Sequence, residues 1–289
     1  MSGRDAAEAA RVEAPVSAQP LYLAGPDGPW DELQSRFGVA GRAVVHTTWG
    51  VWAPAALLDP GLRPLLARDW PRYRQQGAAE SRLGFAASRY LMKHTVAAVL
   101  EVPAAEVDFS YQPGGRPAVR GWEGELELSL SHTDELLVVG VSRTGPVGVD
   151  AEPAGREISF DLLGEQVCTP AEARALAELP EEERRARMLR LWTLKEAYTK
   201  AVGYGLRRRF SQVGFRDDEA GHTLLTGAPD AGQWEFATHL VQDGYVVSEA
   251  HRLDRPVSVR SSTAPSSLEE PEGGPGTALR FRPGTSGSG

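Results

Sequence analysis

The stretch from Glu125 to Pro153, ELELSLSHTDELLVVGVSRTGPVGVDAEP, constrains the fold of this 289-residue chain more than any other. Polar and apolar residues alternate at its start, and it becomes fully apolar at 136–141 before a Gly145-Pro146 turn. Alternation is typical of strands with one buried face, and a short apolar run bounded by turn residues indicates a buried strand. The sequence therefore predicts several strands in the middle of the chain.

Helical patterns lie on both sides of these strands. Residues 78–100 carry apolar side chains at the spacing of one helix face. Thr169, Pro170 and Glu172 form a helix opening, because Thr is a favoured N-cap, Pro suits the first helical position and Glu closes a capping box. A further helix is expected at about 181–201, where glycines follow as a stop signal.

Two more strands are expected after these helices, at 209–215 and 244–250. Each half of the chain thus offers a long helix and several strands. This pattern predicts an α+β (α/β) fold. No repeat is detectable in the sequence, so any duplication of structure would have to be inferred from other signals.

Both ends of the chain are expected to be disordered. Between 261 and 289, 16 of 29 residues are Pro, Gly or Ser, which leaves too few apolar groups to offset the entropy of ordering. We expect tails at 1–20 and 256–289, around an N-terminal subdomain at 21–142 and a C-terminal subdomain at 143–255.

The bulk composition argues against several classes of protein. Apolar residues make up 41% and charged residues 24%, and the net charge of −8 argues against a general nucleic-acid binder. No apolar run approaches the roughly 20 residues needed to cross a bilayer, and the N-terminus lacks the apolar core of a signal peptide. The single cysteine, Cys168, allows no internal disulfide and is interpreted as a buried or incidental thiol. We expect a cytoplasmic protein that binds neither nucleic acid nor membrane.

One segment has a positive charge inside this acidic chain. Between residues 62 and 93 seven basic residues stand against two acidic ones, a local charge of +5. Such asymmetry indicates an anionic ligand or partner, although arginines scattered over a solvated surface would give the same count. The basic residues are Arg63, Arg68, Arg72, Arg74, Arg82, Arg89 and Lys93.

Two carboxylates project from the last predicted strand. Successive side chains of a strand point to opposite faces, so Asp150 and Glu152 lie on one face while Val149 and Ala151 lie on the other. Adjacent carboxylates repel each other, and both gain by sharing a divalent cation such as Mg²⁺, which prefers oxygen ligands. The alternative interpretation is a solvated strand end.

The stretch LWTLKEAYTK, residues 191–200, carries further candidate groups. On a helix Trp192, Glu196 and Lys200 share one face, with Lys195 beside them. Taken alone, this is typical of an ordinary surface helix with a favourable ion pair between Glu196 and Lys200. If Glu196 instead faces the acidic strand, three carboxylates surround one cation and both lysines flank them. That constellation matches the needs of phosphoryl transfer.

A polar pair precedes the acidic strand. Ser131 and His132 lie where a predicted strand gives way to a turn. A histidine there could donate to a phosphate, and the alternative is a merely exposed turn residue.

In their order and spacing these motifs resemble those of the 4′-phosphopantetheinyl transferases, and among them the larger single-chain (Sfp-type) class. The family pattern has an SH turn, a GVD-x-E strand and W-x-x-K-E-A-x-x-K on a helix some forty residues on. Here these are Ser131-His132, Gly148 to Glu152 and Trp192 to Lys200. The resemblance covers residues 60–250. It implies two similar subdomains, each a small, mainly antiparallel sheet packed with a long helix, that form an intramolecular pseudodimer.

The resemblance also implies roles for these residues. Asp150, Glu152 and Glu196 would bind Mg²⁺ together with the coenzyme A pyrophosphate, and Lys200 would contact the phosphates. His132 and Ser131 would help to seat the 3′-phosphate ADP portion. The implied catalytic set is Glu196, Glu152, Lys200, Lys195 and Asp150.

Two further coenzyme A contacts follow from the same resemblance. The family has a G-K-P motif near the nucleotide, and this chain has Gly115-Arg116-Pro117, which keeps the charge but replaces a compact ammonium with a planar guanidinium. A basic residue at the start of the long N-terminal helix also binds coenzyme A in the family. Arg82 is the nearest candidate for that role.

The implied reaction is attack of a carrier-protein serine on the β-phosphorus of coenzyme A, with release of 3′,5′-ADP. Glu196 is the first choice of general base and Glu152 the second, with a metal-bound water as the remaining alternative. Arg207, Arg208 and Arg209 are expected to dock acidic apo acyl or peptidyl carrier proteins onto a monomeric enzyme. The competing hypotheses are a Mg²⁺-dependent nucleotide or pyrophosphate hydrolase and an inactive homologue that only binds carriers or coenzyme A.

Overall fold

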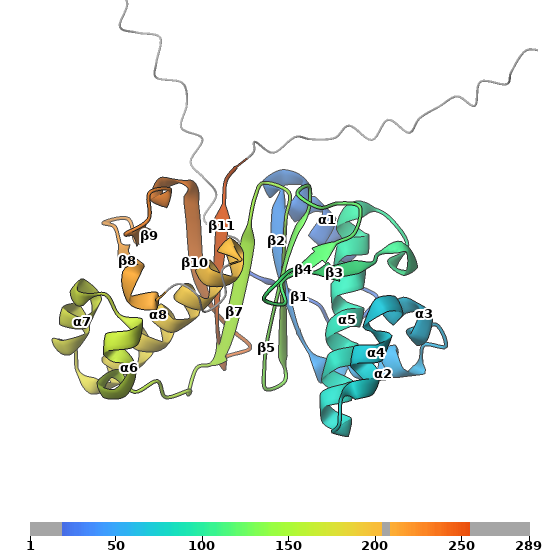
Figure 1. Cartoon of the computed structure of the whole chain (residues 1–289), viewed down its shortest axis with the longest axis horizontal. Helices are drawn as coiled ribbons and strands as arrows, with labels where there is room; N and C mark the ends of the chain where they lie inside the picture. The colour runs from blue at the N-terminus through green and yellow to red at the C-terminus, as the bar shows by residue number, and fades with distance from the viewer. Residues whose placement is uncertain (1–18, 204–208, 255–289) are drawn as a thin grey trace, which may run out of the picture. The chain divides into compact units, whose positions relative to one another are not determined.

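The strands and helices form a mixed α+β architecture, as the sequence predicts (Figure 1). The structure is a computed structural model that describes residues 19–203 and 209–254. The predicted tail at 1–20 lies outside these ranges except for its last two residues, and the tail at 256–289 lies outside them entirely. Within the described part, two sheets lie face to face, and a long helix covers the outer side of each (Figure 1).

The first sheet has six strands in the order β1-β2-β6-β5-β4-β3. Only β1 and β2 run parallel, and every other neighbouring pair is antiparallel. Every residue of β6 is buried, which confirms the prediction of a buried strand from the apolar run at 136–141. The strands are β1 Leu21–Tyr22, β2 Arg42–Thr48, β3 Phe109–Tyr111, β4 Pro117–Val119, β5 Glu127–Thr133 and β6 Leu136–Ser142.

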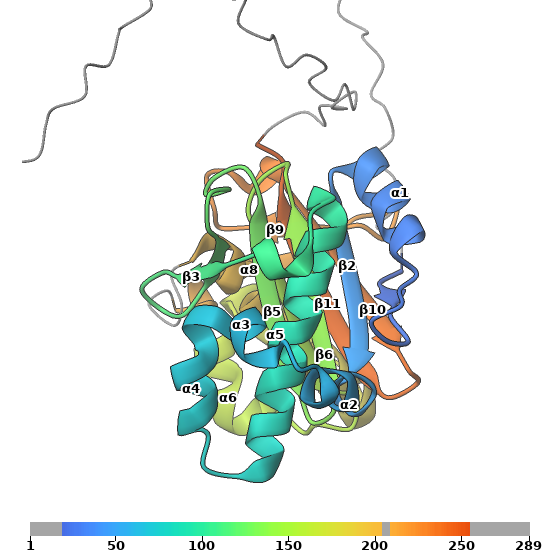
Figure 2. The same cartoon turned by 90° about the vertical axis from the view of Figure 1, so that its right-hand side faces the viewer.

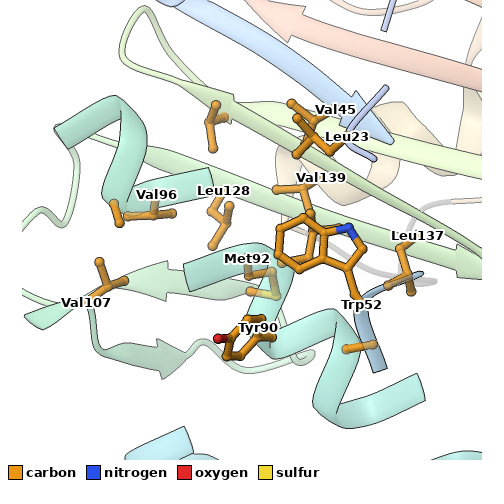
Figure 3. Packing of buried hydrophobic residues seen from close by; sticks show 14 of the residues in the cluster. Leu23, Val45, Trp52, Tyr90, Met92, Val96, Val107, Leu128, Leu137 and Val139 are labelled. Atoms are coloured by element: carbon orange, nitrogen blue, oxygen red, sulfur yellow. The ribbon is translucent and has the colours of Figure 1, made fainter. Parts of the chain in front are cut away.

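The helix predicted at 78–100 is α5, and it covers one face of this sheet (Figure 2). The ring of Trp52 lies among side chains from the sheet, such as Val139, and from α5, such as Met92 (Figure 3). The indole Nε1 of Trp52 donates to Thr47 at 3.0 Å, so its polar edge is satisfied in the core. The helices here are α1 Trp30–Ala40, α2 Trp49–Leu58, α3 Leu62–Leu66, η1 Ala67–Asp69, α4 Trp70–Gln75, α5 Ala79–Leu100 and η2 Ala104–Glu106.

The second sheet has three antiparallel strands in the order β10-β11-β7, and β8 and β9 form a separate hairpin. The predicted capping box opens α7, and α8 ends at Gly203 with a φ of 72°, in the left-handed region that favours glycine. The strand expected at 209–215 is replaced at its start by a short 3-10 helix. These elements are β7 Val147–Pro153, α6 Phe160–Val167, α7 Pro170–Ala177, α8 Glu181–Val202, η4 Phe210–Gln212, β8 Gly214–Asp217, β9 Thr223–Thr226, η5 Ala231–Gln233, β10 Trp234–Val241 and β11 Tyr245–Arg252.

Strands β5 and β7 join the two sheets. The hydroxyls of Ser129 and Ser131 on β5 accept hydrogen bonds from backbone N–H groups of β7, at Val149 (3.1 Å) and Ala151 (3.2 Å). These N–H groups lie on the edge of β7 that faces away from β11, so the serine hydroxyls satisfy donors that would otherwise be left unpaired. A shared apolar cluster fills the space between the sheets. It contains Val44, Leu136, Val138, Val149, Ala151, Val241 and Val247.

Candidate functional site

Strand β7, which carries Asp150 and Glu152, packs directly against helix α8 at Gly148. A Cβ atom at this position would collide with the carbonyl oxygen of Ala197 on α8. Because side chains alternate along β7, Asp150 and Glu152 share the face of Gly148, while Val149 and Ala151 enter the apolar cluster between the sheets. Both carboxylates are therefore held close to the C-terminal turns of α8, and both are buried.

Lys200 binds Asp150 from the last turn of α8. Its ammonium lies 2.7 Å from Asp150 Oδ1, 3.0 Å from Ser131 Oγ and 3.1 Å from the carbonyl oxygen of Val149. The Ser131 hydroxyl in turn donates to Asp150 Oδ1 at 3.1 Å. One carboxylate oxygen thus receives both an ammonium and a hydroxyl, which fixes the orientation of the Asp150 side chain.

Glu152 has a different counter-cation. The guanidinium of Arg156 pairs with its Oε1 atom, and the Thr133 hydroxyl lies 3.5 Å from its Oε2 atom. Arg156 follows β7 in a turn closed by a hydrogen bond from its backbone N–H to the carbonyl of Pro153. The Arg156 guanidinium also lies over the Trp192 ring, 5.7 Å from the ring centroid.

Glu196 completes the group from α8, four residues before Lys200. Burial raises the pKa of Glu196, the negative charge of Asp150 raises it further, and Lys200 acts in the opposite direction. The charges of Glu152 and Arg156 reach Glu196 as well. Burial likewise raises the pKa of Asp150, against the lowering effect of Lys200. The strand and the helix therefore bring three carboxylates into one electrostatically coupled group.

The donor set of this group fits a divalent cation. Carboxylate oxygens are the ligands that Mg²⁺ prefers, and one of them, the buried Asp150 Oδ2, has no hydrogen-bond partner. Across residues 19–203 and 209–254, no three His, Cys, Asp or Glu side chains are already gathered as a ready metal cage. Lys200 and Arg156 neutralise Asp150 and Glu152 instead.

His132 lies at the edge of the same group, at the end of β5. Its side chain is exposed, yet the surrounding protein still displaces enough water to lower its pKa, and the positive charges of Lys200 and Arg89 lower the pKa further. The positive charges of Lys200 on α8 and Arg89 on α5 thus both act on His132 at the end of β5. Such a convergence is suited to an anion.

Arg89 is the member of this basic group that the sequence did not single out. It is buried on α5, where its Nε donates to Asp69 at 3.1 Å and its guanidinium lies over the Phe85 ring. In the sequence, Arg89 was indicated only by the positive charge of the whole segment 62–93. Arg82, the predicted candidate, is exposed in the first turn of α5, seven residues before Arg89 and thus about 10 Å along the helix.

Lys195 is a correction, because it does not flank the carboxylates. Its side chain is 1% exposed, and its ammonium donates to Glu172 and to the carbonyl of Val167, each at 2.6 Å. A third bond goes to the carbonyl of Phe210 at 3.2 Å. Lys195 therefore ties α8 to the start of α7 within the C-terminal core.

Arg116, a predicted coenzyme A contact, forms an ion pair within the protein. Its guanidinium pairs with Glu127 at 2.8 Å, and burial lowers its pKa while Glu127 acts in the opposite direction. It lies near Gly203, at the C-terminal end of α8. Arg209 is exposed, whereas Arg207 and Arg208 fall outside the described residues.

The region that contains β7 and α8 is similar to known proteins. The family model of the 4′-phosphopantetheinyl transferase superfamily matches residues 146–250. This part of the chain is therefore similar to that superfamily. The superfamily region thus contains β7, α8 and the three carboxylates, while Ser131, His132 and Arg89 lie before it.

Relatives extend the likeness to other parts of the chain. The 4′-phosphopantetheinyl transferase HetI of Nostoc sp. is 32% identical over 131 residues, which are 45% of this chain and 55% of HetI. The chain therefore spans only a little over half the length of that relative. A phosphopantetheinyl transferase of Thraustochytrium sp. is 29% identical over 218 residues, 69% of this chain and 74% of its own. The solved holo-acyl-carrier-protein synthase of Thermotoga maritima is 23% identical with a TM-score of 0.31, and covers 38% of this chain and 64% of its own.

In the described ranges, none of the helices is both long enough and apolar enough to cross a bilayer.

Proposed function

We propose that this chain is a 4′-phosphopantetheinyl transferase that moves the phosphopantetheine arm of coenzyme A onto a serine of apo acyl or peptidyl carrier proteins. The observation that carries the proposal is the coupling of Asp150, Glu152 and Glu196 beside Lys200, within the region that matches the superfamily. The names of the relatives, HetI among them, support the same activity. The Sfp-type pseudodimer, the monomeric state and a cytoplasmic location belong to this proposal.

The proposed chemistry needs a charge-neutralising site next to a base. Asp150, Glu152 and Glu196 would hold Mg²⁺, which when bound neutralises charge on the diphosphate of coenzyme A. Lys200 and His132 would hold phosphate oxygens, which the positive charges of Lys200 and Arg89 near His132 support. Glu196 would take the proton of the carrier serine, and its raised pKa brings it closer to the working pH, as suits a general base. The serine oxygen then bonds to the β-phosphorus as the bond to 3′,5′-ADP breaks.

Intact-mass spectrometry tests the proposal directly. The protein is incubated with coenzyme A, Mg²⁺ and a panel of apo carrier domains. Transfer adds the mass of phosphopantetheine, about 340 Da, to a carrier. Release of free phosphopantetheine without a heavier carrier would instead support a Mg²⁺-dependent pyrophosphate hydrolase, and no reaction at all would support an inactive carrier-binding homologue.

We also propose that basic residues just past α8 dock the acidic carrier. Arg209 is exposed, and Arg207 and Arg208 precede it. Replacing the three with glutamate should raise the KM for the carrier and leave the KM for coenzyme A unchanged, because the change repels only the acidic protein. An unchanged KM for the carrier would reject this docking surface.

A further inference from the structure

Arg156 and Lys200 neutralise neighbouring carboxylates, but they are held very differently. Lys200 donates to three separate oxygens and its side chain is 32% exposed. Arg156 pairs with a single carboxylate, that of Glu152, and its side chain is 44% exposed. Arg156 lies in a turn after β7, and its second contact is the face of the Trp192 ring. The Arg156 guanidinium can therefore move into solvent without breaking a strand or a helix.

The pair between Arg156 and Glu152 uses an oxygen that a cation would also need. The guanidinium occupies Glu152 Oε1, and the Oε2 atom of the same carboxylate faces Thr133. A divalent cation bound at Glu152 would lie within a few ångströms of the guanidinium, where like charges repel strongly. The positive charge of Arg156 reaches Glu196 too, so the repulsion is felt at two of the three carboxylates.

We propose that Arg156 is a displaceable counter-cation: it holds Glu152 in the metal-free protein and leaves that carboxylate when a divalent cation binds. The proposal rests on the proposed metal-dependent function. It makes Arg156 a positioning residue that keeps the buried Glu152 charge paired until the metal arrives, at the expense of metal affinity. The neutral variant Arg156→Gln should therefore bind Mg²⁺ more tightly than the wild-type protein.

Calorimetric titration with Mg²⁺ alone, without coenzyme A or carrier, tests this. Loss of one nearby positive charge is expected to lower the Kd for Mg²⁺ by roughly three- to tenfold in Arg156→Gln. Arg156→Lys, which keeps the charge but not the planar fork, should stay close to the wild-type Kd. Arg185→Gln is the matched control, since Arg185 is also an exposed, ion-paired arginine but its partners are Glu157 and Glu181. A Kd for Arg156→Gln that equals or exceeds the wild-type value overturns the proposal.

Thermal unfolding gives a second readout that does not depend on activity. Mg²⁺ should raise the Tm of Arg156→Gln by more than it raises the Tm of the wild-type protein, because stabilisation by a ligand grows as its Kd falls. An equal rise in both proteins contradicts displacement. A wild-type protein that binds no Mg²⁺ also overturns it. A protein that binds Mg²⁺ as described but leaves every carrier unmodified would refute the transferase function and leave the role of Arg156 standing.

Discussion

Lys195 and Lys200 are five residues apart on α8 and have different surroundings. Lys195 is buried in the C-terminal core with Glu172, and burial lowers its pKa against the raising effect of that carboxylate. Glu172 also accepts hydrogen bonds from the backbone of Thr169 and Phe215. Lys195 therefore stabilises the junction of α7, α8 and β8, whereas Lys200 belongs to the acidic group.

Replacing each lysine with methionine should separate these two roles. Lys195→Met leaves Glu172 without its cation, and loss of one partner of a buried pair costs about 3–5 kcal/mol of unfolding free energy. The kcat of the protein that remains folded should change little. Lys200→Met also leaves Asp150 without its cation, but the stability loss should be smaller because Lys200 is 32% exposed. It should lower kcat by about 100-fold or more, because the cation proposed to contact the phosphates is lost. Denaturant unfolding and transfer kinetics on both variants check this, and the reverse pattern would contradict it.

Ionised Glu196 lowers the free energy of unfolding of the metal-free protein. A carboxyl whose pKa is raised by folding contributes stability below its unfolded pKa of about 4.3, and loses that contribution as the pH rises through the folded pKa. At neutral pH the ionised Glu196 therefore opposes folding. This is the sign expected of a group kept for binding rather than for stability.

The variant Glu196→Gln should consequently be more thermostable than the wild-type protein at pH 8 in the presence of a chelator. The difference in Tm should shrink at pH 5, where more of the wild-type carboxyl is protonated. Transfer should fall by about 100-fold or more if Glu196 is the proposed base. Melting curves at the two pH values provide the measurement, and a Glu196→Gln protein that melts below wild type at pH 8 would be inconsistent with the raised pKa.

At the scale of elements, one glycine sets the distance between β7 and α8. Any Cβ at Gly148 would meet the backbone of Ala197 and Ala201 on the helix. The glycine in the GVD-x-E motif is thus required by close packing, and this packing carries Glu196 and Lys200 to the acidic strand. A small shift of α8 would change every distance in the group at once.

Gly148→Ala should therefore destabilise the protein by about 1–3 kcal/mol, as overpacking does, and should reduce kcat at the same time. Gly155→Ala is the control, because nothing lies within 4 Å of a Cβ built there. Unfolding free energies and kcat should change together in Gly148→Ala and stay near wild type in Gly155→Ala. A fully active Gly148→Ala protein would show that the helix position is not critical.

Local signals made most of these elements predictable. The capping box at Thr169, the long helix at 78–100 and the acidic tip of β7 each depend on residues close together in the sequence, and each is found in the structure. The placement of Lys195 was not predictable in this way. A helical pattern gives the angle between Lys195 and Glu196, but only the packing of α8 on β7 decides which of two adjacent faces meets the strand.

Arg89 and Arg156 illustrate a second limit. Tertiary structure brings Arg89 to His132 and Arg156 to Glu152, from a helix and from a turn that carry no recognisable motif at those positions. Charge counting detected the basic segment that contains Arg89 but could not distinguish it from Arg82. The strand pattern predicts that Asp150 and Glu152 lie side by side and repel each other. It does not predict that Arg156 pairs with Glu152.

At the scale of the molecule, the described residues fall within one compact unit. The apolar cluster between the sheets draws its side chains from β2, β6, β7, β10 and β11. An ion pair between Arg42 on β2 and Glu235 on β10 adds a second link. Neither sheet can separate from the other without exposing this cluster to water.

The two sheets should therefore unfold in one step. Val138→Ala removes buried methyl groups from the shared cluster and should cost about 2 kcal/mol, with a single calorimetric transition retained at lower temperature. Differential scanning calorimetry of wild type and variant measures both points. Two resolved transitions, only one of them moved by the substitution, would show that the halves are independent.

The hydroxyl of Ser131 joins strand β5 to Asp150 and Lys200, which stand 19 and 69 residues further along the chain. This has a consequence for recombination between related enzymes. A crossover placed at the 142/143 boundary would combine a serine and a lysine that had not been selected together, even though it cuts no element of secondary structure. Chimaeras that inherit β5, β7 and α8 from the same parent should keep that parent's contacts among this serine, aspartate and lysine, and chimaeras that mix them should not.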